Sequence, residues 1–137
     1  MTDTYALRVE ANSKAAQKAR REQEKRAIDA KIERLRTARD RVATEKQVIK
    51  DLKSAIRKQE KPDDAWKGNK RNRYHDYVSG DFRSYYDTYY NKTDAVHDAI
   101  IRKIADLQNQ SRDLGGIIGW LASAINSLWA DIKAALN

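Results

Sequence analysis

The stretch that decides the fold runs from Ile28 to Ile56 and reads IDAKIERLRTARDRVATEKQVIKDLKSAI. It holds no glycine or proline, and the strong helix formers Ala, Lys, Arg, Glu and Gln dominate it. Its apolar residues recur every seven positions, at Ile28, Leu35, Val42, Ile49 and Ile56. This unbroken spacing predicts a helix with coiled-coil periodicity, in which these residues occupy the d positions of the heptad.

The other half of this predicted seam is mostly polar. Its a positions are Lys25, Ile32, Arg39, Lys46 and Lys53. So narrow an apolar stripe does not stabilise an isolated helix in water, because most helical stability in proteins comes from burying a face against a partner. The helix therefore requires a neighbour, and the segment that follows it in the chain is the first candidate.

A second apolar stripe follows, with steps of three, four or seven residues. Its members are Tyr74, Val78, Phe82, Tyr85, Tyr89, Val96, Ile100, Ile104, Leu107 and Leu114. Thr93 and Ser111 stand at two intervening steps. The two helices predict an all-α fold, a long antiparallel, coiled-coil-like helical hairpin. Gly80 predicts a kink or short break at 79–81, since glycine inside a helix costs about 1 kcal/mol relative to alanine.

Turn residues mark the boundaries between these elements. Pro62 and the aspartates after it are expected to end the first helix and start the second, which Gly115–Gly116 is expected to end. The segments are a basic N-terminal arm with the first helix (1–61), a turn (62–68), the second helix (69–114) and a C-terminal helix (115–137). Within the turn, Trp66 is expected to close the apolar end of the hairpin or to contact a partner, and Gly68 to let the backbone pack closely.

The segment 115–137 is predicted to be an amphipathic helix with a wide apolar face. Asp131 and Lys133 are its only charged residues. Five polar or charged side chains within 117–136 disfavour a membrane-spanning helix. Packing on protein is favoured over peripheral membrane contact through 117–136. The residues assigned to a partner interface are Ile117, Ile118, Trp120, Leu121, Ile125, Leu128, Trp129, Ile132 and Leu136.

A cluster of tyrosines and aspartates lies early in the second helix. Arg83 is the only cation between Arg73 and Lys92, and four aspartates stand among the tyrosines. Those carboxylates would repel a nucleic-acid backbone, so the pattern disfavours single-strand binding. Tyr86 and Tyr90 are four residues apart and fall outside the main stripe. Exposed aromatics beside acids favour a protein interface, to which Tyr86 is assigned, with scattered surface tyrosines as the alternative.

The net charge of +8 is unevenly distributed along the chain. Residues 1–61 hold 18 Lys plus Arg against 10 Asp plus Glu, whereas residues 62–137 hold 10 of each. The simplest interpretation is a solvated helix face. The alternative is a basic helical protein that binds nucleic acid or an anionic membrane surface. The N-terminus lacks the apolar stretch that a cleaved signal peptide needs.

Residues that could carry catalysis are scarce. The absence of cysteine excludes disulfides, thiolate zinc sites and cysteine nucleophiles. The two histidines each precede an aspartate, at His75-Asp76 and His97-Asp98, but a metal site needs further ligands that converge from several helices. No glycine-rich phosphate loop, nucleophile elbow or zinc signature occurs. The sequence therefore predicts a protein that is not an enzyme and uses no metal or cofactor.

Three consecutive stretches resemble the YwqH-like proteins, a branch of the WxG superfamily of small helical hairpins. Trp66-Lys67-Gly68 supplies the Trp-x-Gly motif between two long helices. The stretches read IERLRTARDRVATEKQVIKDLKSAI, DDAWKGNKRNRYHDY and TDAVHDAIIRKIADLQNQ, and they cover about Ile32 to Gln110. Members of this superfamily are exported by the type VII secretion pathway of Gram-positive bacteria.

The resemblance implies a non-enzymatic, chaperone-like or targeting partner of a larger secreted toxin. Such a protein bundles in the cytoplasm with the toxin's helical N-terminal LXG domain, with or without a second small helical protein, and helps present it for export. A homo-oligomer is an alternative. Family members or their partners often carry a Tyr-x-x-x-Asp/Glu export signal, a spacing found here at Tyr90 and Asp94 and at Tyr77 and Asp81. We favour a signal supplied by the partner or formed jointly, and whether this chain is itself exported stays open.

Overall fold

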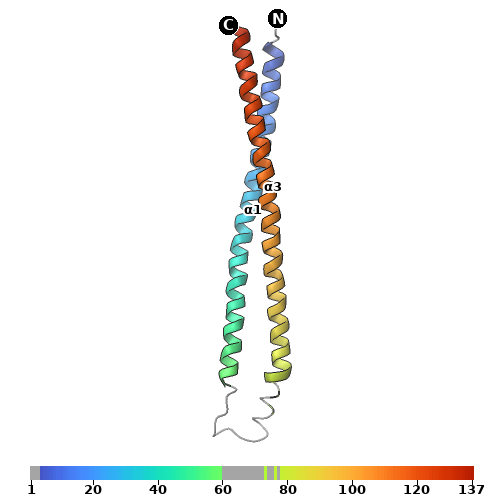
Figure 1. The fold of residues 1–137 in the computed structure, drawn as a ribbon, viewed down its shortest axis with the longest axis vertical. Coiled ribbons are helices and arrows are strands. Elements are labelled where there is room, and N and C mark those ends of the chain that lie inside the picture. The colour runs from blue at the N-terminus through green and yellow to red at the C-terminus, as the bar shows by residue number, and fades with distance from the viewer. Residues whose placement is uncertain (1–3, 60–72, 74–75, 77) are drawn as a thin grey trace. The chain divides into compact units, whose positions relative to one another are not determined.

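A computed structural model describes residues 4–59, 73, 76 and 78–137. Its elements are helix α1 (Thr4–Gln59), a π-helical turn η1 (Val78–Phe82) and helix α3 (Arg83–Leu136), and no strand occurs among the described residues. The two helices pack against each other and run in opposite directions (Figure 1). This confirms the predicted all-α hairpin. The predicted turn at 62–68, with Trp66 and Gly68, lies outside the described residues.

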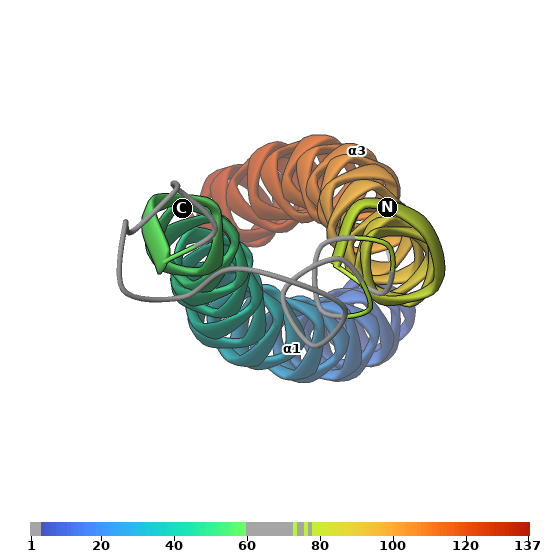
Figure 2. The same ribbon diagram turned by 90° about the horizontal axis from the view of Figure 1, so that it is seen from below.

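The chain forms two compact units, and both helices contribute to each. Unit 1 comprises Met1–Arg34 and Ile104–Asn137, and unit 2 comprises Leu35–Lys103. Figure 2 shows the same two helices from below. The buried hydrophobic residues described in unit 1 are Ala11, Ile32, Ile104, Leu107, Leu121 and Ile132, whereas unit 2 has only Ile49 among its described residues. Unit 1 therefore holds most of the apolar core.

The seven-residue periodicity predicted for α1 is confirmed by burial. The d residues from Ile28 to Ile56 and the a residues from Lys25 to Lys53 are all buried or half-buried. The lysines at a positions lie along the seam with their stems partly covered and their ammonium groups at its edge, an arrangement that long amphipathic side chains favour. The half-polar seam is thus accommodated inside the hairpin.

The stripe predicted on α3 is correct from Ile100 onward but wrong between Tyr85 and Val96. Tyr85, Tyr89 and Val96 are exposed. Phe82 of the predicted stripe is half-buried, but after it the half-buried positions are instead Tyr86, Asp87, Tyr90, Thr93, Asp94 and His97. The lysines of α1 provide the physical reason, because this rotation of α3 gives their ammonium groups carboxylate partners and tyrosine rings.

The prediction that α3 ends at Gly115–Gly116 is wrong. The helix continues through both glycines to Leu136. Residues on either side, including Ser111 and Leu121, are buried in unit 1. Packing of this kind outweighs a helix penalty of about 1 kcal/mol for each glycine. The predicted C-terminal helix at 115–137 is therefore the last part of α3.

The kink or short break predicted at 79–81 falls in a stretch with non-α geometry. Residues Val78–Phe82 form a π-helical turn that contains Gly80 and leads directly into α3. A β-carbon placed on Gly80 would meet nothing within 4 Å, so no side-chain crowding explains the glycine there. The low helix propensity of glycine gives the simplest account of the departure from α-helix.

Candidate protein interface

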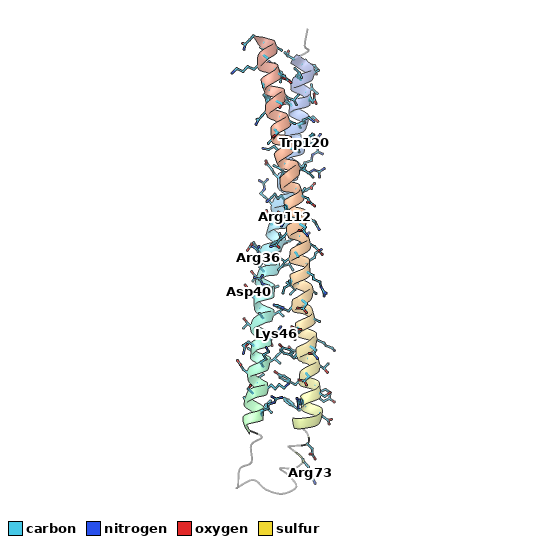
Figure 3. All side chains as sticks on the ribbon, viewed as in Figure 1. Arg36, Asp40, Lys46, Arg73, Arg112 and Trp120 are labelled. Carbon is cyan, nitrogen blue, oxygen red and sulfur yellow. The ribbon has the colours of Figure 1, made fainter. Side chains whose placement is uncertain are left out.

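In unit 2 the seam between α1 and α3 is held by lysines, aspartates and tyrosines. Lys53 Nζ donates to Asp87 Oδ1 at 2.8 Å, and Lys46 Nζ donates to Asp94 Oδ1. Lys46 projects from α1 toward α3 (Figure 3). The Lys46 hydrogen bond lowers the pKa of Asp94 and raises the pKa of Lys46, and the Lys53 hydrogen bond lowers the pKa of Asp87. These two ion pairs fix the register of the helices.

Two tyrosine rings lie beneath the same lysines. Lys53 Nζ is 5.2 Å from the centre of the Tyr86 ring, and the Nζ atoms of Lys46 and Lys50 are 5.7 and 5.6 Å from the centre of the Tyr90 ring. Cations at this distance are attracted to the negative face of an aromatic ring. The tyrosine rings thus provide apolar surface that the lysines of α1 lack. Their negative faces also stabilise the lysine ammonium groups.

The prediction that Tyr86 is exposed in a protein interface is wrong, because its side chain is not exposed. The residue is half-buried in the seam of unit 2, and its ring centre is 6.3 Å from that of Phe82. Its hydroxyl group is buried and has no hydrogen-bond partner among the described residues. Burial, followed by the nearby Asp87 carboxylate, raises the pKa of Tyr86. A buried hydroxyl without a hydrogen-bond partner destabilises the folded state, so this hydroxyl lowers the stability of unit 2.

Unit 1 has its own polar link between the helices. Ser111 Oγ donates to Asp29 Oδ1 at 2.6 Å, and Lys25 Nζ donates to Asp29 Oδ2 at 3.0 Å. The hydrogen bond from Ser111, followed by that from Lys25, lowers the pKa of Asp29. Ser111, which interrupts the apolar stripe in the sequence, is therefore a hydrogen-bond donor to the opposite helix.

These three carboxylates make the free energy of unfolding depend on pH in the acidic range. Asp29, Asp87 and Asp94 have folded-state pKa values below the ordinary 3.8. A carboxyl group with a lowered folded pKa contributes stability that is complete above its unfolded pKa and is lost as the pH falls through the folded pKa. We expect the free energy of unfolding, measured by urea denaturation followed by circular dichroism, to decrease below about pH 4.

Replacing the three aspartates by asparagine should flatten this acid dependence. The matched control is Asp40→Asn, because Asp40 is exposed and its ion pair with Arg39, at 3.2 Å, lies within one helix. The control should keep the wild-type acid dependence. An unchanged acid transition in the triple variant would contradict the role given to these links.

The residues of the predicted export signals occupy different places. Tyr90 and Asp94 are both half-buried in the seam of unit 2, where they contact Lys46. Asp81 is exposed, and Tyr77 lies outside the described residues. In the folded hairpin, Tyr90 and Asp94 are therefore engaged by the opposite helix, and their role as a signal stays a prediction.

The predicted C-terminal interface divides into two sets. Leu121 and Ile132 are buried in unit 1, and Ile118, Ile125 and Leu128 are half-buried there. They belong to the hairpin core and not to a surface available for a partner. The members that remain exposed are Ile117, Trp120, Trp129 and Leu136. Lys14 Nζ lies 5.2 Å from the centre of the Trp120 ring, so this tryptophan is held against α1 (Figure 3).

Unit 2 exposes a further set of large apolar residues that was not predicted. Its members are Val48 and Leu52 on α1 and Tyr85, Tyr89, Val96 and Ile101 on α3. On α1 the signal in the sequence was Val48 and Leu52, which occupy c and g positions beside the predicted seam. On α3, Tyr85, Tyr89 and Val96 belong to the stripe that was predicted to be buried. Exposed apolar surface of this extent on a small protein is typical of an interaction site.

One group of potential metal ligands comes together in unit 2. Ligand atoms of Asp94, His97 and Asp98 lie within 4.8 Å of one another. Lys46 already donates to Asp94, and His97 Nδ1 is 3.8 Å from Asp98 Oδ1. A divalent cation would have to compete with the lysine ammonium, so we interpret this group as part of the charged seam. His75, the other predicted histidine, lies outside the described residues.

Together these features define a small all-α hairpin protein with a charged inner seam and large apolar side chains on its surface. None of the described helices is long and apolar enough to cross a membrane. The chain belongs to the YwqH-like family, whose model matches residues 10–130. This confirms the family suggested by the Trp-x-Gly turn and its flanking helices. A search of curated proteins finds no match to the chain.

Proposed function

We propose that this chain is a non-enzymatic partner subunit that bundles with the helical N-terminal domain of a type VII secreted toxin of the LXG type. In this role it acts in the cytoplasm, in a chaperone-like or targeting capacity, before the toxin is exported. The resemblance to the WxG superfamily motivates the secretion pathway, and membership of the YwqH-like family supports a small helical secretion-associated protein.

The observation that carries the proposal is the exposed apolar surface of a hairpin whose own seam is already closed. Trp120 on unit 1 and Tyr85 and Tyr89 on unit 2 all remain more than half exposed. Aromatic residues are enriched at the centres of protein interfaces, where they contribute most of the binding energy. A partner helix packed on either surface would remove the aromatic side chains of that surface from water.

The cations of α1 support this function more than nucleic-acid binding. Several of them are engaged within the chain, including Lys18 with Glu22, Arg21 with Glu24 and Lys25 with Asp29. Lys46 and Lys53 pair with aspartates of α3 in the seam. Cations engaged in this way contribute less to a continuous phosphate-binding surface.

Co-expression tests the proposal. The chain is produced with the affinity-tagged N-terminal domain of an LXG-type toxin encoded beside it, and the complex is captured at high salt. We expect the two proteins to co-purify, because a bundle held by apolar burial survives salt that dissociates phosphate contacts. A tagged unrelated helical hairpin is the control. Failure to co-purify, together with nucleic acid bound to the chain at moderate salt, would contradict the proposal and favour the basic-helix alternative.

A further inference from the structure

The two sides of unit 2 differ in chemistry. The heptad of α3 follows from its inward residues, with Tyr90 and His97 at a positions and Tyr86 and Thr93 at d positions. Asp87 and Asp94 then occupy e positions and meet the a residues Lys53 and Lys46 of α1, so the a and e positions border one side of the antiparallel pair. Lys50, an e residue of α1, lies over Tyr90 on this same side. This side therefore carries the two lysine–aspartate pairs, and Ile101 is its one exposed large apolar residue among those described.

The g and c positions border the opposite side of unit 2, since d residues are flanked by g in a heptad. Five large apolar side chains occupy this strip, namely Val48, Leu52, Tyr85, Tyr89 and Val96, and their exposed fractions range from 45% to 72%. We call these five residues the c/g strip. They come from both helices, so the strip includes exposed apolar residues of both α1 and α3 within unit 2.

A helix with apolar residues at a/d and again at c/g has two faces to bury. The first face of each helix is covered by the hairpin, whereas the residues of the c/g strip remain 45% to 72% exposed. Packing a third helix into a groove between two others covers both flanks of that groove. The periodicity of the strip therefore fits a helix as its occupant better than a loop or a small molecule.

The charges around the strip indicate the chemistry of that helix. Three exposed cations, Arg41, Lys92 and Lys103, occupy c or g positions beside the strip, against one exposed anion, Glu45. No ion pair within the described part of the chain involves these three cations. A second copy of the chain would bring the same cations to a symmetric interface, where like charges repel. An occupant with acidic residues beside its apolar seam would instead be complementary.

We propose that the c/g strip of unit 2 docks one amphipathic helix of the partner, with its apolar seam against Leu52 and Tyr89 and its acidic side chains opposite Arg41, Lys92 and Lys103. This inference rests on the proposed function for the identity of the partner, the helical N-terminal domain of the toxin. It adds that the c/g strip is the binding surface and that the bound helix carries acidic side chains.

Two pairs of variants test the surface, with the tagged toxin domain as the probe and affinity measured by titration calorimetry. The double variant Leu52→Ser, Tyr89→Ser should bind at least about tenfold more weakly, because it removes two central apolar contacts. Its control replaces polar-side residues, Lys50→Ser and Asn91→Ser, and should bind like the wild type. Circular dichroism establishes that all variants keep the helical content of the wild type.

The second pair tests the charge. Lys92→Glu places an acid beside the strip and should weaken binding by about threefold or more, with a slower association. Arg102→Glu makes the same charge change at an outward f position and should leave binding unchanged. If the wild type binds the domain but the apolar double variant binds equally well, the strip is not the docking surface although the proposed function stands. If Lys92→Glu and Arg102→Glu change binding affinity equally, the inference that the bound helix is acidic would be overturned.

Two other outcomes separate the remaining cases. A wild-type chain that forms a dimer by sedimentation, which the Leu52→Ser, Tyr89→Ser variant abolishes, would show that a second copy covers the strip and would overturn the inference. A wild-type chain that binds no toxin domain would overturn the proposed function and this inference together. Binding that is weakened by the apolar double variant and by Lys92→Glu, but not by their two controls, supports both.

Discussion

Leu121→Ala should lower the free energy of unfolding by about 3 kcal/mol, the typical cost of removing a buried leucine side chain. Leu121 is 2% exposed and lies in the part of α3 that was expected to be a separate C-terminal helix. Here it packs in the core of unit 1, so its truncation loses apolar burial and leaves a cavity. Urea denaturation followed by circular dichroism measures the change.

The matched control for this variant is the preceding residue. Trp120→Ala removes a larger side chain, but that side chain is 63% exposed and its specific contact is the cation–π interaction with Lys14. Such a contact contributes about 1 kcal/mol, so the control should lose no more than that. A larger loss for Trp120→Ala than for Leu121→Ala would show that α3 presents the opposite face to α1.

Ile49→Ala should selectively loosen unit 2, with a local cost of about 2 to 4 kcal/mol. Ile49 is the one buried hydrophobic residue among those described in unit 2, where the rest of the seam consists of lysine–aspartate pairs and tyrosines. The unpartnered hydroxyl group of Tyr86 weakens the same seam. Backbone amides of residues 45–56 and 86–97 should therefore exchange hydrogen faster than in the wild type, since local opening sets exchange rates.

Val48→Ala is the control, because it truncates the neighbouring residue on the exposed side of α1. Its exchange rates should remain close to those of the wild type, as expected for a surface substitution. Uniform acceleration in both units after Ile49→Ala would show that the two units open as one. No acceleration would show that the ion pairs and tyrosine contacts, not Ile49, hold unit 2.

The periodicity of the first helix was predictable because its signal is redundant. Five apolar residues at spacing seven leave only one face for burial, and the a positions follow from them. The structure buries or half-buries all of these positions. The half-polar seam indicated that the helix needs a neighbour, and α3 provides Asp87 and Asp94 as partners for two of its lysines.

The rotation of α3 near its start could not be predicted from its own sequence. Tyr85, Tyr89 and Val96 have helical spacing, but so do Tyr86, Tyr90, Thr93 and His97. Apolar content alone favours the first set as the core. The choice depends on the lysines of the opposite helix, which bind the carboxylates and rings that accompany the second set. Predicting this rotation therefore required knowing which residues of α1 face α3.

The candidate interface was misplaced for the same reason. An apolar stripe at 117–136 indicates burial but not which neighbour covers it. Unit 1 covers Leu121 and Ile132 by α1, and it leaves Trp120 and Leu136 exposed. The prediction that Gly115–Gly116 ends the helix was wrong as well. Two glycines end a helix only where tertiary packing does not continue it. The c/g strip became recognisable only once the inward positions were known.

Hydrogen exchange of the wild-type chain, alone and bound to the helical N-terminal domain of the toxin, tests the central claim most directly. We predict a stable complex in which amides around Val48–Leu52 on α1 and Tyr85–Val96 on α3 exchange more slowly than in the unbound chain, because docking a helix on this surface stabilises unit 2 against local opening. Failure to form a complex, or a complex in which these amides exchange at their unbound rates, would contradict the account.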